Sequence, residues 1–85
     1  MFHVLYHPSV IGEDIRGLNR HIKGRLKAAI ENRLTSAPQD YGKPLRGQLQ
    51  GLWSLRVGDY RVILDIQEAF LRILVLKVGH RESIY

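Results

Sequence analysis

This 85-residue sequence contains no cysteine, so neither a disulfide nor a zinc–thiolate site can support the fold. That composition fits a reducing cytoplasm. No apolar run is long enough to span a bilayer, and we expect no membrane segment or membrane partner. The apolar residues 1–6 lack the basic region and the cleavage pattern of a signal peptide. We therefore expect a single cytoplasmic domain over residues 1–85.

The motifs that carry metal or cofactor chemistry are also missing. The four histidines, at positions 3, 7, 21 and 80, share no ligand spacing with a carboxylate. The eight glycines are scattered rather than gathered in a phosphate-binding loop, and no nucleophile elbow of the Gly-x-Ser-x-Gly type is present. We therefore expect no metal site and no cofactor.

Acidic residues are few, eight against thirteen basic ones, and the net charge is +5. Such a balance favours an acidic partner, either nucleic acid or an acidic protein segment, although it is also common in small soluble domains. Arginines outnumber lysines nine to four. Because arginine binds phosphate bidentately and stacks on bases, this bias favours nucleic acid.

The apolar pattern predicts a strand over residues 2–7 and a helix from Pro8 to about residue 18. A second helix should begin at Asn19, a good N-cap residue, and run to about Ser36. Residues 38–51 are loop-like and basic, and part of them fits a short strand. The nearly apolar run over residues 70–78 is typical of a central strand, and residues 79–85 form a polar tail.

Residues 53–57 and 60–64 predict a β-hairpin around Gly58-Asp59, which suits a type II′ turn. One face carries the core residues Trp53, Leu55, Val57, Tyr60, Val62 and Leu64. The other face carries Ser54, Arg56 and Arg61, with Ile63 exposed among them. Arg56 then faces Arg61, and like charges opposed across strands are destabilising. The pair is therefore either solvated or arranged to hold an anion.

The order of these elements predicts an α+β fold. We expect an N-terminal strand and a helical hairpin packed on a mostly antiparallel, twisted sheet of about four strands.

A protein without a metal can still cut RNA, because the substrate's own 2′-hydroxyl can attack the neighbouring phosphate. The protein must orient the RNA, transfer protons and neutralise the phosphorane. Arg56, Arg61, His80, Arg81 and Tyr85 are suitable for these tasks. Each residue taken alone is more often an ordinary surface or terminal side chain.

Three segments, residues 43–47, 51–63 and 78–85, resemble the RelE/ParE superfamily of bacterial and archaeal toxins, and its RelE branch most of all. The resemblance covers essentially the whole chain. It implies the toxin of a type II toxin–antitoxin pair that enters the ribosomal A site and cleaves mRNA without a metal. A RelB-like or other acidic antitoxin would neutralise it, by covering the basic face or displacing the C-terminal element, and operator DNA would be reached only through that antitoxin.

The resemblance also implies roles for single residues. Arg61 would hold the scissile phosphate, Arg81 would stabilise the transition state or protonate the leaving group, and Tyr85 would stack on the substrate base. Arg56 would be a basic residue beside them. We also expect Lys43 and Arg46 of the basic segment, and Ser54, to bind the substrate.

One departure from the family concerns proton transfer. The best-known members carry two lysines where this chain has Leu52 and Ser54. His80, beside Arg81, is the candidate for the missing group because imidazole titrates nearest neutrality. The alternatives are a ParE-like inhibitor of DNA gyrase that cleaves no RNA, and an inert relative that only binds RNA or its antitoxin.

Overall fold

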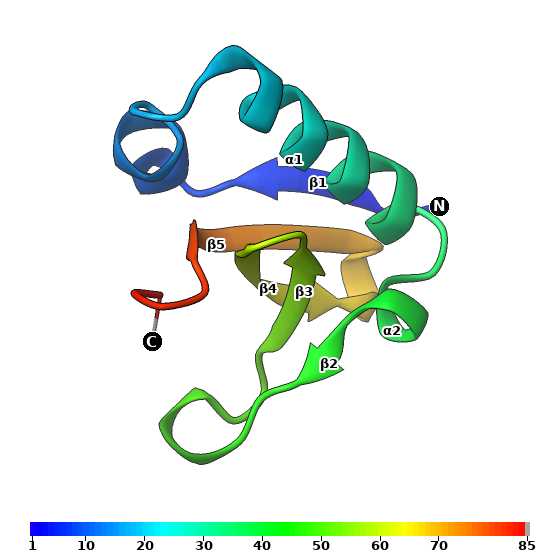
Figure 1. Ribbon diagram of the computed structural model, residues 1–85. Coiled ribbons are helices and arrows are strands. Elements are labelled where there is room, and N and C mark those ends of the chain that lie inside the picture. The colour runs from blue at the N-terminus through cyan, green and yellow to red at the C-terminus, as the bar shows by residue number, and fades with distance from the viewer. Residues whose placement is uncertain (85) are drawn as a thin grey trace.

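The computed structural model describes residues 1–84 and is built on a five-stranded sheet in the order β1-β5-β4-β3-β2 (Figure 1). β1 (His3–Tyr6) pairs in parallel with β5 (Arg72–His80). The other pairs, formed with β4 (Tyr60–Gln67), β3 (Trp53–Val57) and β2 (Lys43–Pro44), are antiparallel. The predicted α+β fold with a mostly antiparallel sheet is confirmed, and the two-residue β2 is the strand beyond the four expected.

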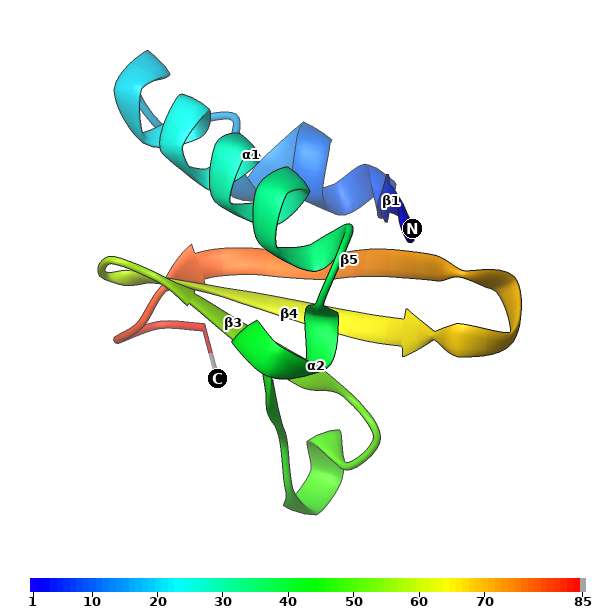
Figure 2. The same cartoon turned by 90° about the vertical axis from the view of Figure 1, so that its right-hand side faces the viewer.

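A helical layer covers one side of this sheet (Figure 2). It contains α1 (Arg20–Leu34), which begins where the sequence predicted, because the Asn19 side chain accepts a hydrogen bond from the Ile22 amide at 2.9 Å. Three α1 residues, Leu26, Ile30 and Leu34, are buried against the strands. This side of the sheet is therefore closed by the apolar stripe of α1.

The first helix is shorter than predicted. Instead of a helix from Pro8 to residue 18, the chain forms a single turn of π-helix, η1 (Val10–Asp14). Gly12 and Gly17 weaken a longer helix, since glycine costs about 1 kcal/mol relative to alanine inside one. η1 is instead tied to the sheet, because the Asp14 carboxylate accepts a hydrogen bond from the Val78 amide at 2.9 Å.

The β3–β4 hairpin has the predicted register, with Val57 opposite Tyr60 and Arg56 opposite Arg61. Gly58 has a φ of 59°, as the first central position of a type II′ turn requires. The predicted core face is confirmed. Its most buried members, Leu55, Val62 and Leu64, are at most 1% exposed.

The loop predicted over residues 38–51 contains short elements. Pro38 begins a four-residue helix, α2 (Pro38–Tyr41), and β2 and the 3-10 turn η2 (Gly47–Leu49) follow it. Proline is favoured in the first turn of a helix, so Pro38, which the sequence interpretation placed in a loop, marks the start of a helix. Between β4 and β5 lies a further 3-10 turn, η3 (Glu68–Phe70). Within residues 1–84, no helix has the length and apolarity needed to cross a membrane.

The Asp14 contact provides a test of how η1 is held. Replacing Asp14 with alanine leaves the Val78 amide without its acceptor, and we expect the free energy of unfolding to fall by about 1–3 kcal/mol. The matched control is Glu13→Ala at the exposed neighbouring position, which should change it by less than about 0.5 kcal/mol. Urea denaturation measures the free energy of unfolding of both variants. An equal loss in the two variants would contradict a stabilising role for the Asp14–Val78 hydrogen bond.

Candidate functional site

The side of the sheet opposite α1 carries the arginine pair. Arg56 on β3 lies opposite Arg61 on β4, which in turn lies opposite Gly79 on β5. Because side chains alternate along a strand, this register puts both guanidinium groups on the same side. The hairpin turn that buries the core residues therefore also brings these two like charges together.

The two arginines line a cavity of 330 Å³, which we call the arginine pocket. Its other walls come from β2 and from the segments beside it, because Lys43 pairs with Ser54 and brings the edge strand alongside. The residues that line it are Tyr41, Lys43, Pro44, Leu45, Ser54, Arg56 and Arg61. None of these lining residues is acidic, so the pocket has a concentrated positive charge.

Arg61 is the unusual group in this pocket. Its Nη1 atom is buried and has no hydrogen-bond partner within residues 1–84. Arg56 is exposed, and its Nε donates a hydrogen bond of 3.4 Å to the Gly58 carbonyl. A buried donor without a partner is costly, and the facing positive charge adds to that cost. An anion bound between the two guanidinium groups would remove both penalties.

The backbone at Arg56 is also contacted by a side chain of α1. The Arg33 Nη1 of α1 donates a hydrogen bond of 3.3 Å to the Arg56 carbonyl. The same guanidinium lies 6.0 Å from the centre of the Tyr41 ring, a cation–π contact. Arg33 thus links α1 to two parts of the arginine pocket.

The exposure predicted for Ile63 is wrong. Ile63 is only 5% exposed, and Ile84 of the predicted polar tail is only 4% exposed. Ile84 approaches so closely that a Cβ atom added to Gly79 would lie 3.4 Å from it. Figure 2 shows this C-terminal segment on the side of the sheet away from α1. The tail therefore packs beside the arginine pocket and helps to cover Ile63.

Two further cations lie in a neighbouring cavity. Arg46 and Lys77 line a hollow of 510 Å³ together with Ile63, Ile84 and the η2 region. Arg46 was predicted as a substrate contact, and it lies beside the arginine pocket rather than inside it. The basic surface thus extends along this side of the sheet beyond the arginine pair.

The predicted catalytic residues near the C-terminus are His80, Arg81 and Tyr85, and they do not form one cluster within the described residues. The Arg81 amide donates a hydrogen bond of 2.8 Å to the Asp59 carbonyl, which continues the β4–β5 ladder by one residue. Arg81 itself lies in the turn that follows β5, and it is exposed. Tyr85 lies outside the described residues.

His80 is not brought together with the arginine pair. It lies opposite Tyr60 on the face of the sheet that α1 covers, and the two rings meet edge to face with centroids 5.7 Å apart. Its Nδ1 also accepts a hydrogen bond from the Glu82 amide at 3.3 Å. The sequence neighbours His80 and Arg81 are thus placed differently, because His80 ends β5 on the face that α1 covers and exposed Arg81 lies in the turn beyond it.

The sequence interpretation missed Tyr41, which lines the arginine pocket and is 54% exposed. An exposed aromatic ring beside clustered cations is a typical platform for a nucleic-acid base. Tyr41 was overlooked because residues 38–51 were taken as a loop. Pro38, as a helix start signal, would have placed Tyr41 at the end of a helical turn.

The arginine pocket is suited to bind an anion and to neutralise charge developing on it. Histidine, aspartate and glutamate, the commonest proton-transfer side chains, are missing from these lining residues. Within the part of the chain that is described, no group of three or more histidine, aspartate or glutamate side chains could hold a metal ion.

Comparison with known families matches residues 4–85 of this chain to the family described as ParE toxin of type II toxin-antitoxin system, parDE. Among curated proteins, the chain is 34% identical over 83 residues to Toxin RelE of Mycobacterium tuberculosis, covering 94% of this chain and 86% of the relative. It is also 40% identical over 52 residues to Toxin RelG of the same organism, covering 61% of this chain and 60% of the relative.

Solved structures of other toxins share the fold of this chain. A chain of the RelBE2 toxin–antitoxin complex of Mycobacterium tuberculosis superimposes with a TM-score of 0.88 at 29% identity, covering 94% of this chain and 98% of that one. A chain of the intact E. coli RelBE complex superimposes with a TM-score of 0.74 at 20% identity, covering 94% of this chain and 96% of that one. The second likeness is one of fold alone.

Because Arg61 has a buried donor without a partner, the arginine pocket should cost stability. We expect Arg61→Met to raise the free energy of unfolding by about 1 kcal/mol, whereas Arg46→Met outside the pocket should change it by less than about 0.5 kcal/mol. At constant ionic strength, added phosphate should raise the melting temperature of the wild type more than that of Arg61→Met. The cost assigned to the arginine pocket would be contradicted if Arg61→Met lowered the free energy of unfolding and if phosphate raised the melting temperature of this variant as much as that of the wild type.

Proposed function

The chain belongs to the ParE toxin family of type II toxin–antitoxin systems, within the RelE branch of the RelE/ParE superfamily, and from this premise we propose that it is a ribosome-dependent, metal-independent mRNA endoribonuclease. The observation that carries the proposal is the arginine pocket. Arg61 there has a buried guanidinium nitrogen without a partner, and Arg56 faces it across the hairpin. A backbone phosphate is the anion that fits this arrangement in an RNA-cleaving toxin.

In the proposed reaction the substrate supplies the nucleophile. The ribose 2′-oxygen forms a bond to the adjacent phosphorus as its proton leaves, and the bond from phosphorus to the 5′-oxygen breaks as that oxygen gains a proton. The products are a 2′,3′-cyclic phosphate and a 5′-hydroxyl. Arg61 and Arg56 stabilise the charge that builds on the phosphorane oxygens, and Arg81 approaches from the end of β5. A divalent cation would be repelled by the same guanidinium pair, which favours a metal-free mechanism.

The rest of the basic side holds and orients the RNA. Lys43 and Ser54 line the pocket with the arginine pair, and Arg46 lies in the adjoining cavity. Exposed Tyr41 offers a face on which a base can stack. Tyr85 keeps the base-stacking role that the family resemblance implies.

Proton transfer is the least complete part of this site. We keep His80 as the proposed proton-transfer group because histidine is the residue type best suited to proton transfer near neutral pH, yet its ring packs on Tyr60 on the other face of the sheet. For His80 to act, the end of β5 must turn toward the RNA. Ribosome dependence fits a pocket of this kind, since a ribosome that holds mRNA in its A site can supply the orientation that the protein alone lacks.

We place this activity in the cytoplasm, where ribosomes and mRNA are found. Several of the solved relatives are in complexes of RelB and RelE, and we propose a RelB-like or other acidic antitoxin as the partner of this chain. The net charge of +5 and the basic side of the sheet suit such a partner. Operator DNA would be bound through the antitoxin and not by this chain.

The second candidate is a ParE-like inhibitor of DNA gyrase that cleaves no RNA. Two observations favour it. The matching family carries the ParE name, and the hairpin has Leu52 and Ser54 where the best-known RelE toxins carry lysines. Ser54 is in addition only 9% exposed.

The two candidates are separated by mapping mRNA 5′ ends on ribosomes after expression of the toxin, together with a gyrase supercoiling assay. We expect codon-phased cuts, and a cleavage rate about 10²–10³-fold lower for Arg61→Ala, because one preorganised charge is lost from the transition state. The control Arg20→Ala, on the helical side, should cleave like the wild type. Intact mRNA with poisoned gyrase would favour the ParE-like function, and neither effect would indicate an inert relative.

The role of His80 can be tested separately. If it transfers a proton, His80→Ala should lower the cleavage rate by about 10²–10⁴-fold and remove the limb of the pH profile that reports the general acid or base. His21→Ala on the exposed face of α1 is the matched histidine control and should retain the profile. An unchanged rate and pH profile in His80→Ala would remove His80 from the mechanism and leave it as a packing partner of Tyr60.

A further inference from the structure

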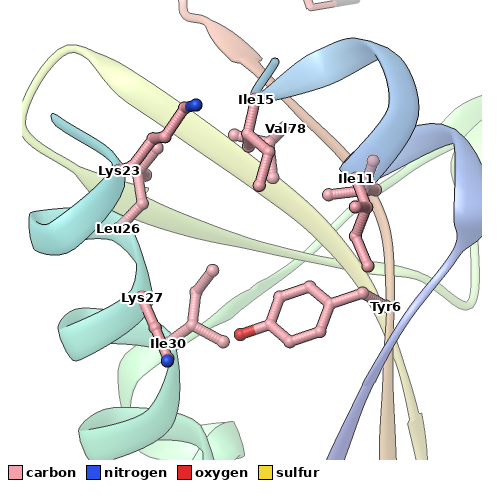
Figure 3. A pocket seen from close by; sticks show the side chains of 9 residues that line it. Tyr6, Ile11, Ile15, Lys23, Leu26, Lys27, Ile30 and Val78 are labelled. Atoms are coloured by element: carbon pink, nitrogen blue, oxygen red, sulfur yellow. The ribbon is translucent and has the colours of Figure 1, made fainter. Parts of the chain in front are cut away.

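A second cavity lies on the helical side of the sheet, away from the arginine pocket. It has a volume of 240 Å³ and lies between α1, η1 and the end of β1 (Figure 3). We call it the helix-side pocket. Its apolar walls are Val10, Ile11, Ile15, Leu26, Ile30 and Val78. An engineered apolar cavity of about 150 Å³ accepts benzene, so this one has room for a leucine or phenylalanine side chain.

One polar group inside this pocket has no partner. The Tyr6 hydroxyl is buried and makes no hydrogen bond within residues 1–84. Burial, and then the nearby charge of Glu31, raise the pKa of Tyr6 above its usual value, so the hydroxyl keeps its proton. In Figure 3 the ring extends across the pocket with its oxygen toward Ile30 of α1. A ligand seated here would gain a hydrogen-bond donor.

The rim of the pocket is basic on one side and apolar on the other. Lys23 and Lys27 are exposed and one helical turn apart on α1, so their ammonium groups lie on the same face of the helix. Across the opening from them, Ile11 is 59% exposed. An apolar hollow bordered by two ammonium groups fits a ligand with an apolar anchor and a nearby carboxylate.

We propose that the helix-side pocket docks an acidic segment of the antitoxin, which inserts one branched or aromatic side chain and places a carboxylate against Lys23 and Lys27. The identity of the partner rests on the proposed function. The position of the pocket means that the antitoxin holds the toxin on the side opposite the arginine pair as well as over the basic surface. Neutralisation then has an anchor that does not depend on contacts to the arginine pocket.

Other occupants fit less well. A second copy of this chain would bring another surface of net charge +5 toward the two lysines. RNA would place phosphates and polar sugars against six aliphatic walls. An acidic amphipathic protein segment matches both the charge of the rim and the apolar interior, and a buried apolar anchor is the usual hot spot of such an interface.

The test uses the full-length toxin and its cognate antitoxin, with the dissociation constant measured by calorimetry. The double variant Lys23→Glu/Lys27→Glu should weaken binding at least tenfold, about 1.4 kcal/mol. The control Arg16→Glu/Arg20→Glu makes the same change of net charge at exposed positions that do not line the pocket, and should weaken it by less than about threefold. Equal losses in the two variants would show general charge attraction and overturn the proposal.

Two further measurements address the apolar anchor. Ile11→Ser, at a position that is 59% exposed, should also weaken binding of the antitoxin about tenfold. In NMR spectra of the wild type, the Ile15 and Ile30 methyl signals should shift when the antitoxin is added, and unchanged signals in a complex that forms would overturn the proposal.

These experiments do not depend on RNA cleavage. Tight antitoxin binding with the predicted losses, in a toxin that cuts no mRNA, would uphold this pocket and reject the nuclease function. A wild-type toxin that binds no antitoxin would overturn the assignment of the partner.

Discussion

The register of the β3–β4 hairpin is the constraint on which the rest of the structure depends. A glycine with positive φ at position 58 allows a two-residue turn, and that turn fixes Val57 opposite Tyr60. A slip of one residue would exchange the two faces of the sheet. The same register that buries Leu55 and Val62 under α1 must therefore bring Arg56 and Arg61 together on the other side.

The two sides of the sheet serve different purposes. The helical side supplies most of the apolar burial that stabilises so short a chain, and it retains a small apolar pocket with a basic rim. The other side keeps a facing pair of cations and a buried donor without a partner. Natural proteins tolerate such unfavourable groups where a ligand relieves them, and the phosphate proposed for the arginine pocket would account for both features.

Much of the fold could be predicted from the sequence because its signals are local. The alternating hairpin residues, the Gly58-Asp59 turn and the Asn19 cap each specify an element through short-range chemistry. The length of the first helix was overestimated, because its apolar spacing fits a helix although the segment contains Gly12 and Gly17. The hydrogen bond between the Val78 amide and the Asp14 carboxylate is a long-range contact that the sequence does not reveal.

The candidate site was predicted only in part. Arg56, Arg61, Lys43 and Ser54 meet in one pocket because hairpin pairing is regular and the edge strand follows it. The covering of Ile63 by Ile84 and the position of Tyr41 depend on how the tail and α2 fold back. Tertiary contacts of this kind leave no periodic signal in a sequence. His80 lies on the other face because neighbours in sequence point to opposite sides of a strand.

In the proposed function, the arginine pocket holds the RNA phosphate at the cleavage point. The most direct measurement is an experimental structure of the toxin on a ribosome whose A-site mRNA carries 2′-deoxy sugars and so cannot be cut. We expect the scissile phosphate within hydrogen-bond distance of the Arg61 guanidinium, with Arg56 beside it. An mRNA that passes over another surface, with the arginine pocket empty or closed, would contradict it.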